Sequence, residues 1–170
     1  WQTAALPAFD WQQLKDNKDK EIKRLNGIYR NILDASGVQI IEGRAVFEDP
    51  HKVRVGDQVF TARHILIATG GHSKLPDLPG IELAIDSDGF FALTEQPKRV
   101  MVVGGGYIAT ELAGVFAGLG SQVHLVHRGD ILLKGFDHEI ASFVTEAIAS
   151  YTDLHLNSQV SKIEKVIKSN

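Results

Sequence analysis

The sequence predicts an α/β fold in which short antiparallel strands precede a parallel β-α-β unit. Residues 100–103 have the pattern of an apolar strand that runs through a glycine-rich turn into a helix. Residues 38–69 instead alternate with a period of two, and a long helical pattern precedes them. An antiparallel meander and a β-α-β unit are different architectures, so we expect parts of two domains, residues 1–82 and 83–170.

The first expected element is a long amphipathic helix that begins near Asp10. The Asp10 side chain can cap the helix, Gln13 can bond back to the first turn, and Phe9 can pack against Leu14. Apolar residues then recur at spacings of three and four until Gly37, which is a plausible stop. We expect this apolar stripe to pack on a sheet.

Short strands follow the helix. The period of two predicts strands at residues 38–41, 44–47, 52–55, 58–61 and 64–69. Gly56 and Asp57 form a hairpin signal between two of them. Residues 65–68 are continuously apolar, so we expect that strand to be buried on both faces.

Residues 70–80 are rich in glycine and proline and end the regular structure. Their composition favours a linker, although the glycines would also let a phosphate or adenosine group come close to the backbone. Residues 86–91 indicate a second turn, whose acidic side chains are expected to cap a turn or helix and not to bind a metal.

The strand at residues 100–103 leads into the motif Gly104-x-Gly106-x-x-Ala109. Gly104 permits a tight turn, Gly106 lets a pyrophosphate approach the backbone, and Ala109 lets the helix pack on the strand. Leu119 and Gly120 then indicate a helix stop, and residues 122–127 alternate as a second strand. This context favours a Rossmann-like dinucleotide site over an ordinary tight turn.

The end of the second strand bears on which dinucleotide is bound. NAD sites usually place an acid there for the ribose, whereas this chain has Arg128, followed by Lys134. A guanidinium and an ammonium suit a 2′-phosphate, which favours NADPH. Two alternatives stay open: both cations could be solvated loop residues, and Asp130 could be a displaced ribose acid.

The remaining residues predict a capped helix from Asp137 to Tyr151 and strands at 153–156 and 160–167. None of the seven histidines is paired with an acid or another histidine at helical i, i+4 spacing, so we expect no metal site. His124 is expected on the surface. His127 could lie on the strand surface, in a loop or against a phosphate.

Composition excludes several classes of function. A net charge of −3 gives no basic field for nucleic acid, and no apolar run approaches the length of a membrane span. The chain has no cysteine, which excludes thiol catalysis and disulfides within it. Because it starts at Trp1, we expect it to be an internal piece of a longer protein.

An ordered series of segments resembles the flavin-dependent disulfide reductases, most closely the glutathione reductases. The resemblance covers almost the whole chain from about Phe9 and is more specific than any single glycine motif. The matching segments are residues 43–45, 63–71, 76–80, 86–91, 103–114, 126–134 and 136–137.

The resemblance implies roles for individual residues. It assigns the NADPH site to Gly104, Gly106, Tyr107, Ile108, Ala109, Glu111, Arg128 and Lys134. Tyr107 matches the ring over the nicotinamide pocket, and Glu111 matches an acid that pairs with a lysine beside the flavin. These two are the candidate catalytic residues. Contacts to FAD are assigned to Ala45, Thr69 and Gly70. The family commonly has arginine at Lys134, so bidentate contact is weaker there.

The resemblance also implies a parent protein in which NADPH reduces FAD, FAD reduces a disulfide, and the dithiol reduces glutathione disulfide. The redox cysteines are expected before Trp1, and the catalytic His-Glu pair and most of a homodimer interface beyond Asn170. A cytoplasmic location is expected, and the isolated chain is not expected to be catalytically competent. Alternatives are dihydrolipoamide dehydrogenase, trypanothione reductase, mercuric reductase, or a nucleotide-binding module without catalysis.

Overall fold

The computed structural model describes residues 9–166, which fall into two compact units. One unit comprises residues 16–72, and the other combines residues 1–15 with 73–170, of which 9–15 and 73–166 are described. The expected domain boundary between residues 82 and 83 stays a prediction. None of the described helices is long and apolar enough to cross a bilayer.

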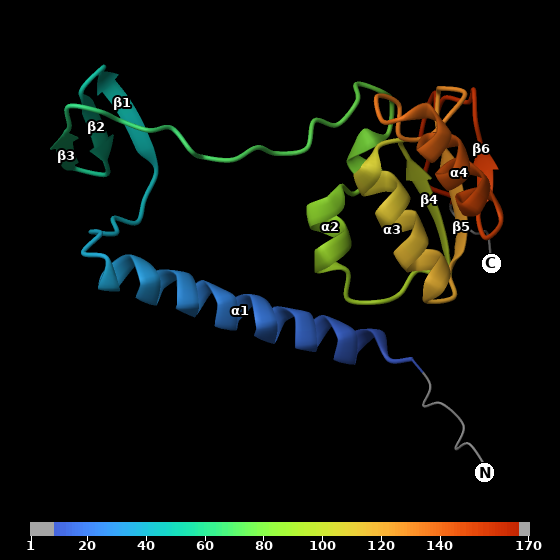
Figure 1. Ribbon diagram of the computed structural model, residues 1–170, viewed down its shortest axis with the longest axis horizontal. Coiled ribbons are helices and arrows are strands. Elements are labelled where there is room, and N and C mark those ends of the chain that lie inside the picture. Colours follow the sequence, from blue (N-terminus) through green and yellow to red (C-terminus); the bar gives the residue numbers. More distant parts are fainter. Residues whose placement is uncertain (1–8, 167–170) are drawn as a thin grey trace, which may run out of the picture. The chain divides into compact units, whose positions relative to one another are not determined.

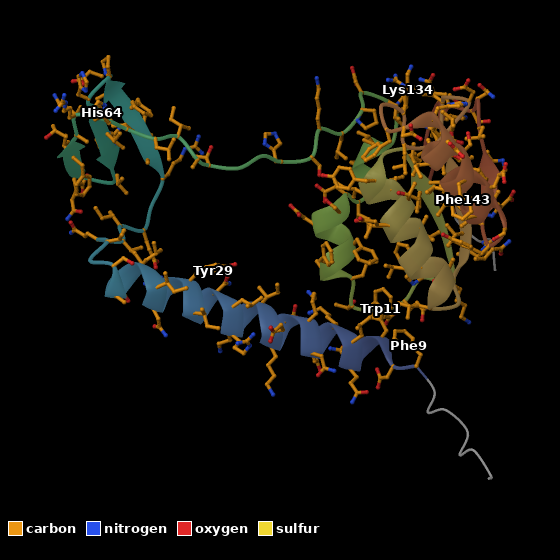
Figure 2. All side chains as sticks on the ribbon, viewed as in Figure 1. Phe9, Trp11, Tyr29, His64, Lys134 and Phe143 are labelled. Atoms are coloured by element: carbon orange, nitrogen blue, oxygen red, sulfur yellow. The ribbon has the colours of Figure 1, made fainter. Side chains whose placement is uncertain are left out.

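Helix α1 (Trp11–Ala35) begins in one unit and continues into the other. The Gln13 N–H donates to the Asp10 carboxylate at 3.1 Å, which confirms the predicted cap. Gly37 has a φ of 72° and donates to the Asp34 carbonyl, so the helix ends as predicted. No residue of α1 is buried, and Tyr29 projects from it with 64% of its surface exposed (Figure 2). The expected packing of the whole apolar stripe on a sheet is therefore not seen among the described residues.

An antiparallel sheet of three strands makes up the rest of the unit 16–72 (Figure 1). Its strands are β1 (Ala45–Asp49), β2 (Lys52–Val55) and β3 (Gln58–Thr61), paired in the order β1-β2-β3. Val55 faces Gln58 across the two residues Gly56 and Asp57, and Gly56 has a φ of 59°. The predicted meander and its hairpin are thus confirmed.

Two strands predicted in this unit are wrong. Residues 38–41 and 64–69 are irregular, and the run expected to be buried on both faces is exposed, with Leu66 at 89% and Ile67 at 67%. A continuously apolar strand needs a hydrogen-bonded neighbour on each side and a covering layer on each face. The described part of the chain supplies neither to these residues.

The other unit is built on a parallel sheet in the order β4-β5-β6. Its strands are β4 (Arg99–Val103), β5 (Gln122–Val126) and β6 (Asp153–His155). Helices α3 (Tyr107–Gly118) and α4 (His138–Ala149) connect them and cover one face of the sheet (Figure 1). The predicted β-α-β unit, and with it the predicted fold class, is confirmed.

The core of this unit lies between the sheet and the two helices. Trp11 stacks on Phe116 with ring centroids 6.2 Å apart, and its indole N–H donates to the Leu93 carbonyl at 3.0 Å. On the opposite face of the sheet, Met101 and Val103 are 57% and 58% exposed. The buried cluster is Ala113, Phe116, Val123, Leu125, Leu132 and Ile148.

Local capping explains where the short elements begin. Asp86 accepts the Gly89 N–H at 3.0 Å at the start of α2 (Ser87–Ala92), after the 3-10 turn η1 (Ile81–Leu83). That bond holds the pKa of the Asp86 carboxyl below its ordinary value. Asp137 accepts two backbone N–H groups at 3.1 Å and caps α4, and Gly120 has a φ of 94° after α3, both as predicted.

The strand predicted at residues 160–167 is wrong. Residues 160–166 are irregular, and residue 167 lies outside the described residues. The Ile163 N–H donates to the Pro79 carbonyl at 2.8 Å, and a Cβ on Gly80 would lie 1.9 Å from the Ile163 oxygen. This segment therefore packs against a proline-glycine turn instead of adding a strand to the sheet.

Candidate nucleotide site

The glycine turn joins β4 to α3 with the geometry that its sequence predicts. Gly104 has a φ of 144°, and its N–H donates to the Val126 carbonyl at 2.9 Å. A Cβ at Gly104 would lie 3.2 Å from the Cβ of Ala109, so only small residues let the helix approach the strand this closely. Gly106 precedes α3, and a Cβ built on it meets no atom within 4 Å. No side chain caps the start of α3, and the first backbone N–H groups of a helix have no partner within the helix.

A pocket of about 510 Å³ lies at this turn and contains both predicted cations. The Leu133 N–H donates to the Gly105 carbonyl at 2.6 Å, which holds the loop after β5 against the glycine turn. Lys134, which directly follows Leu133 and is labelled in Figure 2, lines the same pocket as Arg128. The lining residues are Gly105, Gly106, His127, Arg128, Gly129 and Lys134.

A second hollow of about 360 Å³ adjoins the first. Gly105, His127 and Arg128 line both, and the second also reaches Gly104 and Val103. Together the two hollows follow the glycine turn along the carboxyl ends of β4 and β5. Ligands of open α/β sheets bind at this edge.

His127 is the site residue that sequence analysis left undecided. A Cβ at Gly105 would lie 2.4 Å from its Nδ1 and one at Gly129 would lie 2.7 Å from its Nε2, so the ring fits between two glycines. Its Nε2 is buried and has no hydrogen-bond partner among the described residues. A buried nitrogen without a partner beside a hollow favours a polar ligand there. In the sequence, Gly105 and Gly129 are the residues that indicate this position of the ring, because only glycine leaves room for it.

The residues assigned to the nicotinamide side lie on the first turns of α3. Tyr107 and Ile108 are 58% and 46% exposed and line a further pocket of about 490 Å³ together with Ala109. Glu111 is exposed and does not line that pocket. Because Tyr107 and Glu111 are four residues apart on one helix, they share a face.

The residues assigned to FAD belong to the other unit. Ala45 opens β1, whereas Thr69 and Gly70 lie in an irregular segment, and all three are exposed. Gly70 has a φ of 70°, and no atom lies within 4 Å of a Cβ built on it. The assignment of these three residues to FAD stays a prediction.

The nucleotide pocket meets the requirements of a dinucleotide phosphate. It offers a helix N-terminus for the pyrophosphate, room above Gly106, and two cations for a further phosphate. Asp130, the alternative ribose acid, does not line either hollow at the turn. The donor set therefore fits a phosphorylated dinucleotide such as NADPH.

Comparison with known proteins agrees with this geometry. Residues 2–168 match the family model described as pyridine nucleotide-disulphide oxidoreductase. The chain is 47% identical over 137 residues to the chloroplastic/mitochondrial glutathione reductase of Pisum sativum, covering 81% of this chain and 25% of the relative. It is 46% identical over 170 residues to the glutathione reductase of Schizosaccharomyces pombe, covering 95% of this chain and 37% of the relative.

Solved structures give the same result for the fold. The HOCl-induced flavoprotein disulfide reductase RclA of Escherichia coli superposes with a TM-score of 0.82 at 29% identity, over 91% of this chain and 37% of that one. The chain thus spans between a quarter and two fifths of the length of the proteins it matches. On the family match and these identities, the chain belongs to the pyridine nucleotide-disulphide oxidoreductase family.

Proposed function

We propose that this chain is the central, NADPH-binding portion of a glutathione reductase. The observation that carries the proposal is the convergence of Arg128 and Lys134 on one pocket with Gly105 and Gly106 at the start of α3. The relatives named glutathione reductase at 46% and 47% identity support the same assignment.

The pocket supports NADPH over NADH for an electrostatic reason. The 2′-phosphate is the feature that distinguishes the two nucleotides, and Arg128 can hold it with two parallel hydrogen bonds. Lys134 adds a point charge at the same hollow, although it makes a less directional contact than arginine. Dihydrolipoamide dehydrogenase, a user of NAD among the alternatives, would be expected to offer an acid there instead.

The chain's other assigned residues have roles around this nucleotide. Gly104, Gly106 and Ala109 shape the turn for the pyrophosphate, and Ile108 lines the hollow beside the first turn of α3. Tyr107 covers the nicotinamide end and Glu111 orients the flavin side through a partner outside this chain. When bound, NADPH supplies the reducing equivalents.

The proposal extends to the longer protein of which this chain is a part. Ala45, Thr69 and Gly70 contact the adenosine part of FAD, and residues 1–82 belong to the FAD-binding domain while residues 83–170 belong to the NADPH-binding domain. The redox disulfide lies outside the chain, which has no cysteine. The substrate is glutathione disulfide, and the parent is a cytoplasmic homodimer.

The experiment that tests the proposal is a calorimetric titration of the chain with NADPH and, separately, with NADH. We expect tighter binding of NADPH, and we expect Arg128→Ala to weaken NADPH binding alone, by about 1.5–3 kcal/mol for a lost charged hydrogen bond. Arg99→Ala is the matched control, since Arg99 is exposed at the opposite end of β4 from the glycine turn. Circular dichroism of each variant verifies the fold.

Two outcomes would contradict the proposal. An equal loss of NADH affinity in Arg128→Ala would show that the guanidinium does not distinguish the two nucleotides by binding the 2′-phosphate. Tighter binding of NADH by the unaltered chain would favour dihydrolipoamide dehydrogenase among the alternatives.

A further inference from the structure

Three polar side chains converge on the face of the parallel sheet opposite the buried cluster. His124 lies on β5, and Asp153 and His155 lie on β6. The parallel register pairs His124 with Asp153 and Val126 with His155. Because residues two apart on a strand share a face and neighbouring strands lie about 4.8 Å apart, the register alone places these three side chains in a triangle.

The distances within this triangle are short and similar. His124 Nδ1 lies 2.9 Å from Asp153 Oδ2, and His155 Nε2 lies 3.4 Å from the same oxygen. The two ring nitrogens lie 3.4 Å from each other. The imidazoles stack with centroids 5.7 Å apart and an interplanar angle of 18°, so both rings present a nitrogen to the same point beside the carboxylate.

The donor set and its spacing are those of a transition-metal site. Imidazole nitrogen and carboxylate oxygen are zinc ligands, bound at about 2.0–2.2 Å, and tetrahedral angles then place ligand atoms roughly 3.3–3.5 Å apart. The two distances of 3.4 Å match that edge, and the third is shorter by half an ångström. Magnesium and calcium prefer oxygen ligands throughout, which this triangle does not supply.

We propose that His124, Asp153 and His155 bind one Zn²⁺ ion on the open face of the β5–β6 pair. The side chains are 31%, 56% and 42% exposed, so water reaches the site and occupies the fourth coordination position. The three side chains come from β5 and β6, and none of the three residues lines the two hollows at the glycine turn.

Histidine at helical spacing does not reveal this group, because that pattern indicates ligands on one turn of a helix. Here His124 and His155 are 31 positions apart and meet through parallel strand pairing. The expectation that the chain has no metal site is replaced by this proposal. The pattern in the sequence that indicates such a site is Asp153-x-His155 on one strand, because side chains two residues apart lie on the same face.

The alternative is a hydrogen-bonded group without a metal, in which one carboxylate oxygen of Asp153 accepts from the rings of His124 and His155. That arrangement satisfies the same distances with protons in place of a metal. The two interpretations differ in what the chain binds, because only the metal site takes up a stoichiometric ion.

The test is a calorimetric titration of the 170-residue chain with zinc sulfate in a non-chelating buffer. We expect one ion per chain, and at least about tenfold weaker binding in each of His124→Gln, Asp153→Asn and His155→Gln, because changing even an outer partner of a zinc ligand costs tenfold or more. His138→Gln is the matched control, since His138 is an exposed histidine of the same unit at the start of α4. Its affinity should equal that of the unaltered chain.

A second measurement does not depend on any variant. Titration of the unaltered chain with Co²⁺ should give a visible absorption band of a low-coordinate nitrogen and oxygen site, which Zn²⁺ then removes. Absence of zinc uptake, equal affinity in all three ligand variants and the control, or equally tight binding of Mg²⁺ would each overturn the proposal.

Discussion

The two units of the chain differ most in what their apolar residues contact. In the unit with the parallel sheet, Leu125 and Leu132 are completely buried between sheet and helices. In the unit of residues 16–72, no described residue is buried, and Leu66 is 89% exposed. Both units contain comparable apolar patterns and regular elements.

The difference shows that hydrogen-bonded pairing and burial are separate requirements. The strands β1 to β3 pair with one another without a covering layer, with a register shift between Phe47 and Asp49, because tight turns bring consecutive strands into backbone hydrogen bonding. The β-α-β unit also brings its own cover, since each crossover helix packs on the strands that it connects. We therefore expect the unit with the parallel sheet to contribute most of the folding stability and to hold the ligand-binding residues in fixed positions.

The largest difference in the free energy of unfolding should come from replacing one leucine by alanine in each unit. Leu125→Ala should lower the free energy of unfolding by about 2–5 kcal/mol, because it removes a buried side chain and leaves a cavity. Leu66→Ala should change it by less than about 0.5 kcal/mol, as expected at an exposed position. Urea unfolding followed by circular dichroism measures both, and equal effects would contradict the contrast in burial.

The next effect concerns ligand binding and not stability. Gly106→Val should weaken NADPH and NADH alike by about tenfold or more, or 1.4 kcal/mol, because a branched side chain would fill the space above the turn. Gly27→Val in the other unit is the control: no atom lies within 4 Å of its added Cβ, and it is remote from the glycine turn in sequence. Unchanged nucleotide affinity in Gly106→Val would refute the role of the glycine turn.

A smaller effect should follow from removing a helix cap within the packed unit. Asp137→Ala deletes the acceptor of the Glu139 and Ile140 N–H groups at the start of α4 and should cost about 1 kcal/mol. Asp137→Asn keeps an acceptor oxygen and should retain most of that stability. Thermal unfolding of the two variants separates them, and a loss in Asn equal to that in Ala would show that charge, not capping, is responsible.

The smallest effect should be a loss of helicity in α1 at acid pH, within the unit of residues 16–72. Arg24 donates to both carboxylate oxygens of Glu21 at 2.7 and 2.8 Å, which lowers the pKa of Glu21 below its ordinary value of 4.5. A depressed folded-state pKa contributes stability that is present above the unfolded value and is lost as the pH falls through the folded one. We expect a small loss of helicity below about pH 4.5 by circular dichroism.

The pair itself can be tested by a double-substitution cycle. Glu21→Gln and Arg24→Gln should each reduce that loss, and the double variant should add nothing further. Additive effects of the two substitutions would assign the acid sensitivity to other carboxylates of the helix.

Local chemistry explains which predictions from the sequence were correct. Asp10, Asp86 and Asp137 cap helices or turns, and Gly56 turns a hairpin, because each of these choices depends on a few neighbouring residues. The strands at 38–41, 64–69 and 160–167 were not correct, because a strand is completed only by a partner that its own sequence does not specify.

The sequence by itself determined the hairpin meander, the β-α-β order, the glycine turn and the types of side chain around that turn. Those features follow from periodicity and backbone freedom, which act over short range. Only the tertiary structure showed how the loop after β5 is held for this, through the backbone bond from the Leu133 N–H to the Gly105 carbonyl at the pocket that Arg128 and Lys134 line. It also decided that His124, Asp153 and His155 meet, since parallel register joins residues that lie far apart in the chain.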